Sequence, residues 1–284
     1  MTEPANTAPF PDGHFYSPIV DREEVGRRQS TIWPERPVAL GIDFNDESHE
    51  RILREDFPRF IGDYDYPDEL EESADLELFF SNNSQFGWQD SRALFVMLRS
   101  LGPRRIVEVG SGFSSLLMAD VNRRFFSGGI DITCIEPYPR PFLEKGIPGI
   151  SRLVKSVVQD VPLDLFEALE AGDVLFIDSS HVSKTGSDVN YLYFEVLPRL
   201  RKGVLIHIHD IFLPAEYLKD WVLGEGRSWN EQYVLRAMLM YSTAFKIVFG
   251  CSYAFARFPD LVQQALARPD GAAFAGGSIW LLRT

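Results

Sequence analysis

Two short stretches of the sequence combine carboxylate and imidazole side chains. They are Asp178-Ser-Ser-His181 and His207-Ile-His209-Asp210, and each lies at the end of an apolar run that is typical of a buried strand. If these strands are neighbours in a parallel sheet, their polar residues meet at one edge of it. Such a set can hold a divalent cation, or it can form an acid–base pair in which an imidazole takes a proton. Both alternatives are open: Asp178, His181 and His209 are the catalytic candidates, and Asp178, His209 and Asp210 are the candidate cation ligands.

The alternation of side chains along a strand predicts which of these residues share a face of the sheet. Side chains alternate between the two faces, which predicts that His207 and His209 share one face and that Asp210 lies on the other. His207 lies deepest in its strand, so it is the weakest candidate for a role in catalysis or cation binding. Lys184 follows closely, and it could act as a base only if it were desolvated; a surface position is expected for it.

A glycine turn, Gly110-Ser-Gly112, is the main candidate for ligand binding. It follows a run rich in β-branched residues, 106–109, and precedes a predicted helix over 114–121. Strand, glycine turn and helix start together are typical of a nucleotide-binding βα unit. Glycine can take a positive φ and has no Cβ that would hold a ligand away from the backbone.

The residues around this turn indicate what kind of nucleotide would bind. Glu108 precedes the turn, and a carboxylate there suits a ligand with positive charge, such as an amino acid ammonium group. Ser115 stands where the dinucleotide pattern G-x-G-x-x-G has its third glycine, which disfavours NAD.

Polar residues also end the next two predicted strands. Glu136 ends the second, where a carboxylate can accept hydrogen bonds from both ribose hydroxyls of a nucleoside. Gln159 and Asp160 follow the third. They can hydrogen-bond an adenine amino group, or they can cap the helix that comes next.

Strand and helix alternate in the second part of the chain. The predicted strands are 106–109, 131–136, 152–158, 174–178, 203–209, 245–251 and 278–282. Predicted helices cover 140–145, 163–170 and 187–200, the last with Tyr191, Phe194, Leu197 and Leu200 facing inward. This alternation predicts an α/β fold with a doubly wound, mostly parallel seven-stranded sheet. The final strand has no helix after it and is expected to enter the sheet antiparallel.

The first part of the chain has a different pattern. Prolines interrupt its beginning, and helices are predicted at 46–57, 69–80 and 90–101. We therefore divide the chain into an N-terminal arm with cap helices, 1–85, and a nucleotide-binding domain, 86–284. The N-terminal part is expected to cap an acceptor site or to pair subunits as a homodimer.

Composition limits the partners. The net charge of −13 disfavours nucleic acids, because phosphate binding requires basic patches. No apolar run reaches the roughly 18 residues of a membrane span, and residues 1–13 lack the order of a signal peptide. Cys134 and Cys251 are expected to be buried free thiols in a reducing cytoplasm. A small-molecule substrate is the partner that these properties favour.

The ordered series Glu108-x-Gly110-x-Gly112, Glu136, Asp160, Asp178-x-x-His181 and His209-Asp210 resembles class I S-adenosylmethionine-dependent methyltransferases. The resemblance covers residues 90–284 and is nearest to small-molecule O-methyltransferases of the catechol type. It implies S-adenosylmethionine as cofactor. The implied cofactor contacts are Glu108, Gly110, Ser111, Gly112, Ser114, Glu136, Asp160 and Asp178.

In the catechol type, acids after strands four and five hold a magnesium ion that binds the substrate oxygens. Asp178 and Asp210 match those two acids, but Ile211 stands where the family has an Asn ligand. The implied activity is methyl transfer to an oxygen or nitrogen of a small acceptor, with a divalent metal still open. The alternatives are an NAD-linked oxidoreductase and a non-catalytic nucleoside-binding module.

The segment between the fifth and sixth strands carries three aromatic residues, Trp221, Trp229 and Tyr233, which line a substrate site or belong to the core. Ser228-Trp-Asn-Glu231 fits a capping box, so we expect Glu231 to be structural rather than catalytic.

Overall fold

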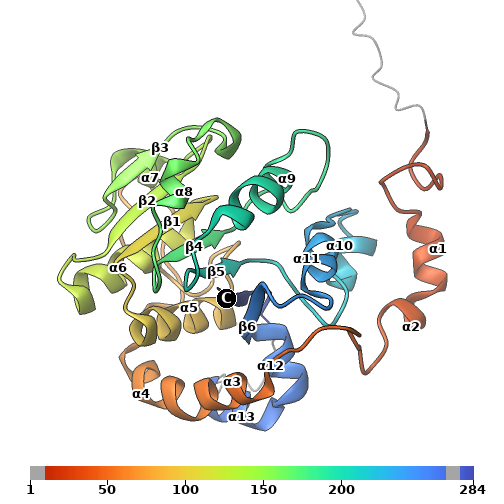
Figure 1. Ribbon diagram of the computed structural model, residues 1–284, viewed down its shortest axis with the longest axis horizontal. Helices are drawn as coiled ribbons and strands as arrows, with labels where there is room; N and C mark the ends of the chain where they lie inside the picture. The colour runs from red at the N-terminus through yellow and green to blue at the C-terminus, as the bar shows by residue number, and fades with distance from the viewer. Residues whose placement is uncertain (1–9, 267–275) are drawn as a thin grey trace, which may run out of the picture.

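A seven-stranded sheet forms the centre of the computed structural model, which describes residues 10–266 and 276–284 (Figure 1). The strand order is β3-β2-β1-β4-β5-β7-β6. The strands are β1 (Arg105–Val109), β2 (Asp131–Ile135), β3 (Arg152–Val154), β4 (Val174–Ile177), β5 (Leu205–Ile208), β6 (Phe245–Gly250) and β7 (Ile279–Arg283). The predicted doubly wound, mostly parallel sheet is confirmed.

The final strand runs against its neighbours, as expected. β7 pairs antiparallel with β5 and with β6, so it lies between two strands that precede it in the sequence. The other pairings, from β3 through β5, are parallel.

The chain reverses its direction of winding between β1 and β4. From β1 it proceeds to β2 and β3 on one side, and from β4 to β5 on the other. Backbone hydrogen bonds continue one residue past the strand ends, since the amide of Asp178 donates to Val109 and that of His209 donates to Ile177. The carboxyl ends of β1, β4 and β5 therefore lie in register at the position where open α/β sheets bind ligands.

One face of the sheet is covered by helices from both ends of the chain. The main pair is α5 (Trp88–Leu101) and α6 (Phe113–Phe126), with α7 (Pro141–Lys145) beside them. The others are α3 (Asp46–Arg51), the π-helix η1 (Ile52–Asp56), α4 (Phe57–Phe60), the 3₁₀ turn η2 (Ile61–Asp63), α12 (Cys251–Arg257) and α13 (Pro259–Leu266). Residues of η1, α4 and α13 share one core cluster with α5 and α6. The predicted cap helix over 46–57 thus packs beside the nucleotide-binding domain.

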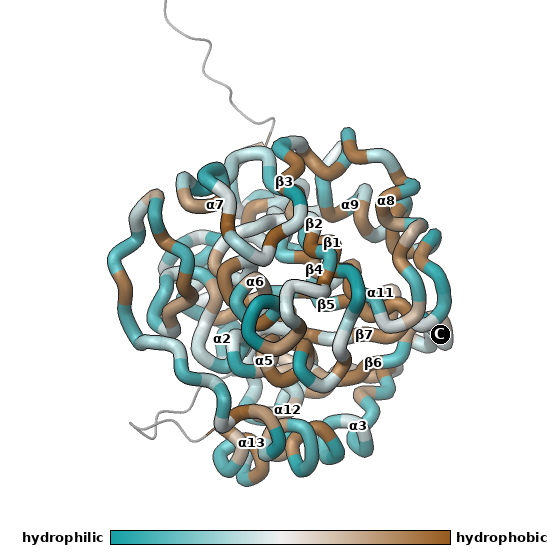
Figure 2. The backbone as a smooth tube through the Cα atoms, turned by 90° about the vertical axis from the view of Figure 1, so that its left-hand side faces the viewer, coloured by the Kyte–Doolittle hydropathy of each residue, from teal (hydrophilic) through white to brown (hydrophobic). Residues whose placement is uncertain are grey.

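The opposite face carries a second core cluster. Its helices are the 3₁₀ turn η3 (Val158–Asp160), α8 (Asp164–Glu167), α9 (Asp188–Tyr191), the π-helix η4 (Leu192–Val196), the 3₁₀ turn η5 (Leu197–Arg199) and α11 (Glu231–Leu239). In the side view, brown apolar segments run through the strands between these two layers (Figure 2). The sheet is therefore buried on both faces, which explains its continuous apolar runs.

The predicted helix over 187–200 is present, but it is not a continuous α-helix, and one of its residues expected to be buried is exposed. It begins as α-helix, widens to a π-helix and closes as a 3₁₀ turn. Pro198 has no N–H to donate to the preceding turn, which favours such a change of register. Phe194, expected to face inward, is exposed.

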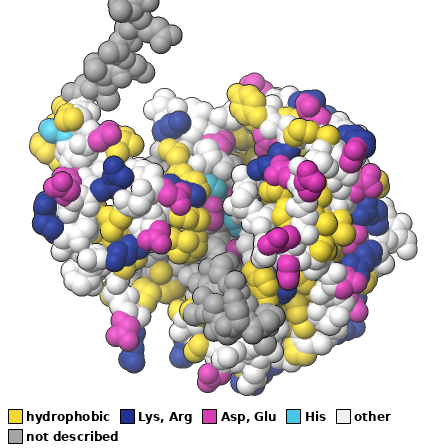
Figure 3. Space-filling view, turned by 180° about the vertical axis from the view of Figure 1, so that it is seen from behind, with side chains coloured by type: hydrophobic (Ala, Val, Ile, Leu, Met, Phe, Trp, Pro, Cys, Tyr) yellow, Lys and Arg dark blue, Asp and Glu magenta, His cyan; other side chains and the backbone are white. Residues whose placement is uncertain are grey.

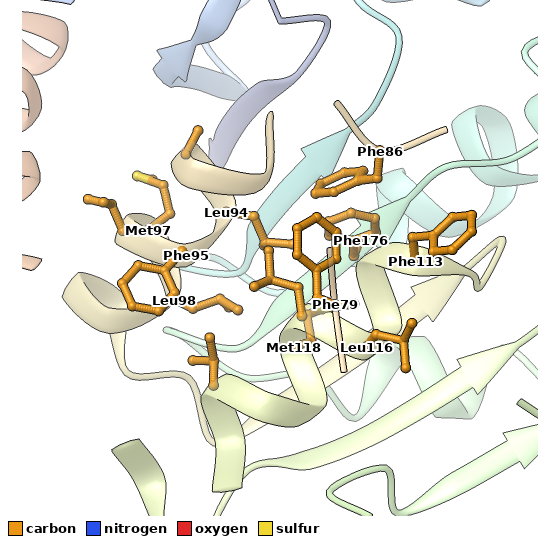
Figure 4. Packing of buried hydrophobic residues seen from close by; sticks show 14 of the residues in the cluster. Phe79, Phe86, Leu94, Phe95, Met97, Leu98, Phe113, Leu116, Met118 and Phe176 are labelled. Carbon is orange, nitrogen blue, oxygen red and sulfur yellow. The ribbon is translucent and has the colours of Figure 1, made fainter. Parts of the chain in front are cut away.

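The predicted helix over 69–80 is wrong, because the segment from 64 to 87 is almost entirely irregular. Its aromatic residues do not form one helical stripe but insert singly between helices. Figure 4 shows Phe79 and Phe86 among the side chains of α5 and α6. The acidic residues that precede Phe79 face outward, where Glu72 pairs with Arg140 and Asp75 pairs with Lys145.

The most N-terminal helices lie at one side of the molecule (Figure 1). They are α1 (Arg22–Arg27) and α2 (Gln29–Ile32), and α1 contacts α10 (Lys219–Leu223). Trp33 ties this segment down by donating a hydrogen bond to the carbonyl of Tyr217, at 2.7 Å. Within 10–266 and 276–284, no helix has the length and apolar character of a membrane span.

Candidate functional site

A cavity of about 930 Å³ opens at the carboxyl ends of β1, β4 and β5. Figure 3 shows histidine and acidic side chains inside a hollow between two parts of the surface. The glycine turn and Glu136 form part of its lining, and Asp178, His181, His209 and Asp210 form another part. The structure thus brings together most of the residues that the sequence singled out.

Gly110 is required by the protein's own backbone. Its φ is +84°, and a Cβ atom at this position would overlap the carbonyl oxygen of Asp178. Only glycine adopts this conformation without strain while β4 passes so close. The turn and the end of β4 are therefore packed directly on each other.

Gly112 is in a different situation. Its φ of −166° is extended, and the nearest atom to an added Cβ would be Oε1 of Gln85, at 3.8 Å. Beside it, the Ser111 amide donates to Oε2 of Glu136 at 3.2 Å, and the Tyr138 amide donates to Oε1 at 2.8 Å. Glu136 is thereby fixed at the cavity edge after β2.

Glu108 does not line the cavity, contrary to the expected contact with a ligand. Its carboxylate is fully buried and accepts hydrogen bonds from Ser114 Oγ at 2.6 Å, Ser115 Oγ at 2.5 Å and Cys134 Sγ at 3.2 Å. Burial raises its pKa to about 7, although the serine hydroxyls and the thiol oppose this shift. Glu108 therefore fixes the start of α6 from behind the glycine turn.

Asp178, His181 and Asp210 form the centre of the site. Nε2 of His181 lies 3.4 Å from Oδ1 of Asp178 and 3.4 Å from Oδ2 of Asp210. One potential ligand atom from each residue lies within 4.8 Å of the others, so the three side chains could hold a metal ion between them. This group contains His181 in place of the predicted cation ligand His209.

The second imidazole, His209, lies directly behind the two aspartates. Its Nδ1 is 3.3 Å from Asp178 and 3.6 Å from Asp210, and its Nε2 is 3.6 Å from Oδ2 of Asp90. Asp90, at the start of α5, also accepts the Gly277 amide. Both ring nitrogens of His209 therefore face carboxylates, and His209 bridges Asp90 to the central group.

The expectation that Asp210 lies on the face opposite His209 is wrong. β5 ends at Ile208, and Asp210 has a left-handed φ of +55°, which turns its carboxylate back toward the histidines. His181 has a φ of +60°. Non-glycine residues in this region are uncommon, and such conformations cluster at functional sites.

The charges of this group depend on one another. Burial opposes a charge on His181, but Asp178 and Glu231 outweigh it and raise the pKa of His181 to about 10. Burial likewise opposes a charge on His209, while Asp210 and Asp178 hold its pKa well above the usual value. The two histidines in turn lower the pKa of Asp178 against the effect of burial. The group is thus built to hold positive charge between carboxylates.

Glu231 is a site residue that sequence reasoning missed. The predicted capping box is wrong, because α11 begins with Asn230 as N-cap and no side-chain capping bond forms. Glu231 is instead fully buried, with Oε2 at 2.9 Å from Nδ1 of His181. Its proximity to His181 comes from tertiary packing across 50 residues, which the local pattern does not encode.

Aromatic residues form the wall beside His181. The ring of Trp229 lies 4.4 Å from that of His181, and Trp221 lies 5.2 Å from Trp229. The Arg227 guanidinium covers both indoles and pairs with Glu225 at 2.6 Å. Both tryptophans line the cavity; Tyr233 does not, and its hydroxyl donates to Glu216.

Three other candidates lie outside the cavity. His207 is buried in the core, stacked on Phe176, and burial lowers its pKa to about 3. Asp160 lines a separate, smaller pocket beside β3, so its expected adenine contact is not part of this site. Lys184 is exposed, as expected. Cys134 and Cys251 are buried free thiols, although Cys251 starts α12 rather than ending a strand.

Known proteins resemble this chain in sequence and in fold. A family model of a methyltransferase domain matches residues 107–211. An uncharacterized protein of Archaeoglobus fulgidus is 42% identical over 165 residues, which are 57% of this chain and 74% of that protein. Among solved structures, the O-methyltransferase TomG from Streptomyces achromogenes in complex with SAM has 15% identity and a TM-score of 0.42, covering 92% of this chain and 96% of that one. An O-methyltransferase from Bacillus cereus in complex with SAH has 15% identity and a TM-score of 0.40, covering 92% and 97%.

The chain is a methyltransferase, and its sheet has the fold of the class I S-adenosylmethionine-dependent methyltransferases. The matched methyltransferase domain begins within β1 and ends just after β5, and the antiparallel β7 agrees with the expectation for the final strand. The protein is therefore an enzyme that uses S-adenosylmethionine, and the NAD-linked and non-catalytic alternatives are set aside.

The two glycines of the turn should differ in their tolerance of a side chain. Gly110→Ala is expected to lower the free energy of unfolding by more than about 2 kcal/mol, because it combines a left-handed φ with a backbone clash. Gly112→Ala should change it by less than about 1 kcal/mol. Urea unfolding of both variants measures this, and equal losses would contradict the packing described for Gly110.

Glu108 should make stability depend on pH. Its folded pKa of about 7 lies above the ordinary value of 4.5, so folding takes up a proton between these values. This contribution is complete below the unfolded pKa and is lost as pH rises through the folded one. Relative to Glu108→Gln, the wild type should lose up to about 3 kcal/mol between about pH 5 and about pH 8. Parallel stability profiles in urea would show that Glu108 titrates normally.

Proposed function

We propose that this methyltransferase transfers the methyl group of S-adenosylmethionine to a hydroxyl oxygen of a small, uncharged acceptor. The observation that carries the proposal is the arrangement within one cavity, where a glycine turn and Glu136 adjoin a buried group of two aspartates and an imidazole. A nucleoside and a second small molecule both have room in about 930 Å³.

The cofactor is placed against the glycine turn. Gly112 leaves open space in front of the backbone, and Glu136 presents a fixed carboxylate after β2 for the ribose hydroxyls. Ser111 and Ser114 complete this part of the lining. The sulfonium of the cofactor would then face a cavity rich in carboxylates, which favours its positive charge.

Asp178, His181 and Asp210 fit a divalent cation. Their ligand atoms have the required spacing, and two carboxylates with one imidazole suit manganese, iron or zinc at least as well as magnesium. A cation bound there would lower the pKa of an acceptor hydroxyl and neutralise the facing aspartates. His209 stays with Asp90 and Asp178 as a buried positive partner of the group.

The transfer itself requires little from the protein beyond positioning. The acceptor oxygen attacks the methyl carbon, the carbon–oxygen bond forms as the carbon–sulfur bond breaks, and S-adenosylhomocysteine leaves. The proton of the acceptor hydroxyl goes to the group at Asp178, His181 and Asp210 or through it to solvent. The rings of Trp229 and Phe86 pack against His181 and His209, and water excluded by them would strengthen these interactions.

The wall around Trp221 and Trp229 favours an acceptor with a flat apolar face. The charges that line the cavity limit the class of acceptor further. Five carboxylates line the cavity, at Asp90, Glu136, Asp178, Asp210 and Glu225, whereas the single arginine of the lining, Arg227, is paired with Glu225. An acceptor carrying a carboxylate or phosphate near its hydroxyl would be repelled, so neutral phenols and sugar-like alcohols are favoured.

The placement of the cofactor is tested by calorimetric titration with S-adenosylhomocysteine. Gly112→Val should abolish measurable binding, because the branched side chain fills the space in front of the turn. Glu136→Ala should weaken binding about 10- to 100-fold through the lost ribose contact. Asp160→Ala serves as the control and should bind normally. Unchanged affinity in folded Gly112→Val protein would refute the placement.

The reaction and its cation are tested together. Wild-type protein is incubated with S-adenosylmethionine labelled in the methyl group and with pairs of hydroxylated rings that differ only by a carboxylate. Label should pass to the uncharged member, should be lost after chelation and should return with a single divalent metal. Full transfer after chelation would remove the cation and leave the buried group of Asp178, His181 and Asp210 to take the proton.

The cation must compete with a proton, because the pKa of His181 is raised to about 10. Below that value, metal binding should release a proton, and the affinity should rise by up to tenfold per pH unit. Calorimetry with manganese in buffers of different protonation enthalpy measures the released proton, and Asp210→Asn should abolish the binding heat. A proton count of zero would show that His181 is not a ligand.

A further inference from the structure

The carboxylate of Glu231 has no ordinary structural explanation at its position. It is completely buried at the first residue of α11, and it makes no capping bond there. The start of α11 is held without it, since the amides of Asn230 and Glu231 both donate to the carbonyl of His181, at 3.0 and 3.2 Å. Burying a carboxylate is costly, so a partner must compensate for it.

Its hydrogen-bonded partner is the His181 imidazole, and the buried hydroxyl of Tyr193 also interacts with this carboxylate. Oε2 of Glu231 lies 2.9 Å from Nδ1, which must carry a hydrogen to face an ionised carboxylate. The other ring nitrogen, Nε2, is then aimed between Asp178 and Asp210, at 3.4 Å from each. The ring cannot turn aside easily, because Trp229 lies along it with the centroids 4.4 Å apart.

We propose that Glu231 is the positioning residue of the methyl-transfer site, holding His181 with its proton on Nδ1 and its Nε2 directed at the aspartates. The arrangement serves both roles considered for His181. A metal-binding imidazole usually donates its other N–H to a carboxylate, which fixes the ring and raises its basicity. A general base requires the same fixed tautomer.

The second imidazole supports this assignment by contrast. Asp90 also backs a histidine, but its oxygen lies 3.6 Å from Nε2 of His209, beyond a hydrogen bond, and it accepts the Gly277 amide instead. Only Glu231 combines a short contact to a ring nitrogen of the central group with complete burial among the residues described. The role of His181 in catalysis rests on the proposed function, whereas its orientation by Glu231 does not.

The orientation can be measured without knowing the acceptor. The chain has five histidines, so ¹⁵N-labelled imidazole signals are few, and His181→Gln identifies the signal of interest by its loss. In the wild type, Nδ1–H should give a downfield, slowly exchanging proton signal. Glu231→Leu, which keeps the volume but removes the acceptor, should abolish the slow exchange. Glu231→Gln should keep a weaker hydrogen bond through its carbonyl oxygen.

A neighbouring variant separates positioning from simple support of the loop. Asn230 also joins α11 to the His181 loop, since its Oδ1 accepts the Ser183 amide at 2.5 Å. Asn230→Ala should lower the melting temperature but keep the Nδ1–H signal. If Asn230→Ala and Glu231→Leu change the signal equally, or if Glu231→Leu leaves it intact, Glu231 is merely structural and the proposal fails.

A functional readout completes the test. Manganese affinity, measured by calorimetry, should fall about 10- to 100-fold in Glu231→Leu and less in Glu231→Gln. With an active acceptor, kcat should fall while the KM for S-adenosylmethionine stays unchanged. If the wild type shows the Nδ1–H signal but neither binds manganese nor transfers methyl groups, the proposed function fails and the positioning stands. Manganese affinity that is unchanged in Glu231→Leu would overturn the positioning alone.

Discussion

The mutual repulsion of buried carboxylates is the constraint on which this site depends. Asp178 and Asp210 approach the same imidazole nitrogen, and Asp90 and Glu231 stand behind the two histidines. Two like charges about 4 Å apart cost about 4 kcal/mol at the effective dielectric of a protein. Positive charge between them, as imidazolium or as a bound cation, relieves this repulsion, and burial together with the neighbouring acids Asp178 and Asp90 raises the pKa of Asp210. Each buried carboxylate of the group is therefore stabilised by the histidine that it faces.

The sheet makes this charged group possible by placing its members with little freedom. β1, β4 and β5 end in register, and the backbone of Gly110 rests against that of Asp178. Left-handed turns at His181 and Asp210 then direct both side chains into the same space. A shift of any one strand tip would separate the glycine turn from the aspartates, so cofactor binding and acceptor activation depend on the same packing.

The strands themselves, the glycine turn and the acids at the strand tips were predictable because they depend on local pattern. Periodicity predicts strands, and a doubly wound sheet brings their carboxyl ends to one edge. The predictions that were wrong concerned features that depend on contacts distant in sequence. Glu231 looked like a helix cap, Asp210 like the far face of a strand, and 69–80 like a helix. In each case a contact distant in sequence determined the structure. Glu231 contacts His181, and Asp210 turns toward His181. The aromatic residues near 69–80 pack between α5 and α6.

The position of β7 determines the order in which the strands can pair while the chain is synthesised. This last strand lies between β5 and β6, and the Gly277 amide just before it bonds to Asp90 behind His209. Ribosomal synthesis delivers the N-terminal elements first. A nascent chain can pair β1 through β5 early, but β6 has no neighbour to pair with until β7 arrives. The catalytic centre is therefore closed by the strand of the sheet that is translated after the other six, and a chain interrupted before β7 would leave its charged pocket open on one side.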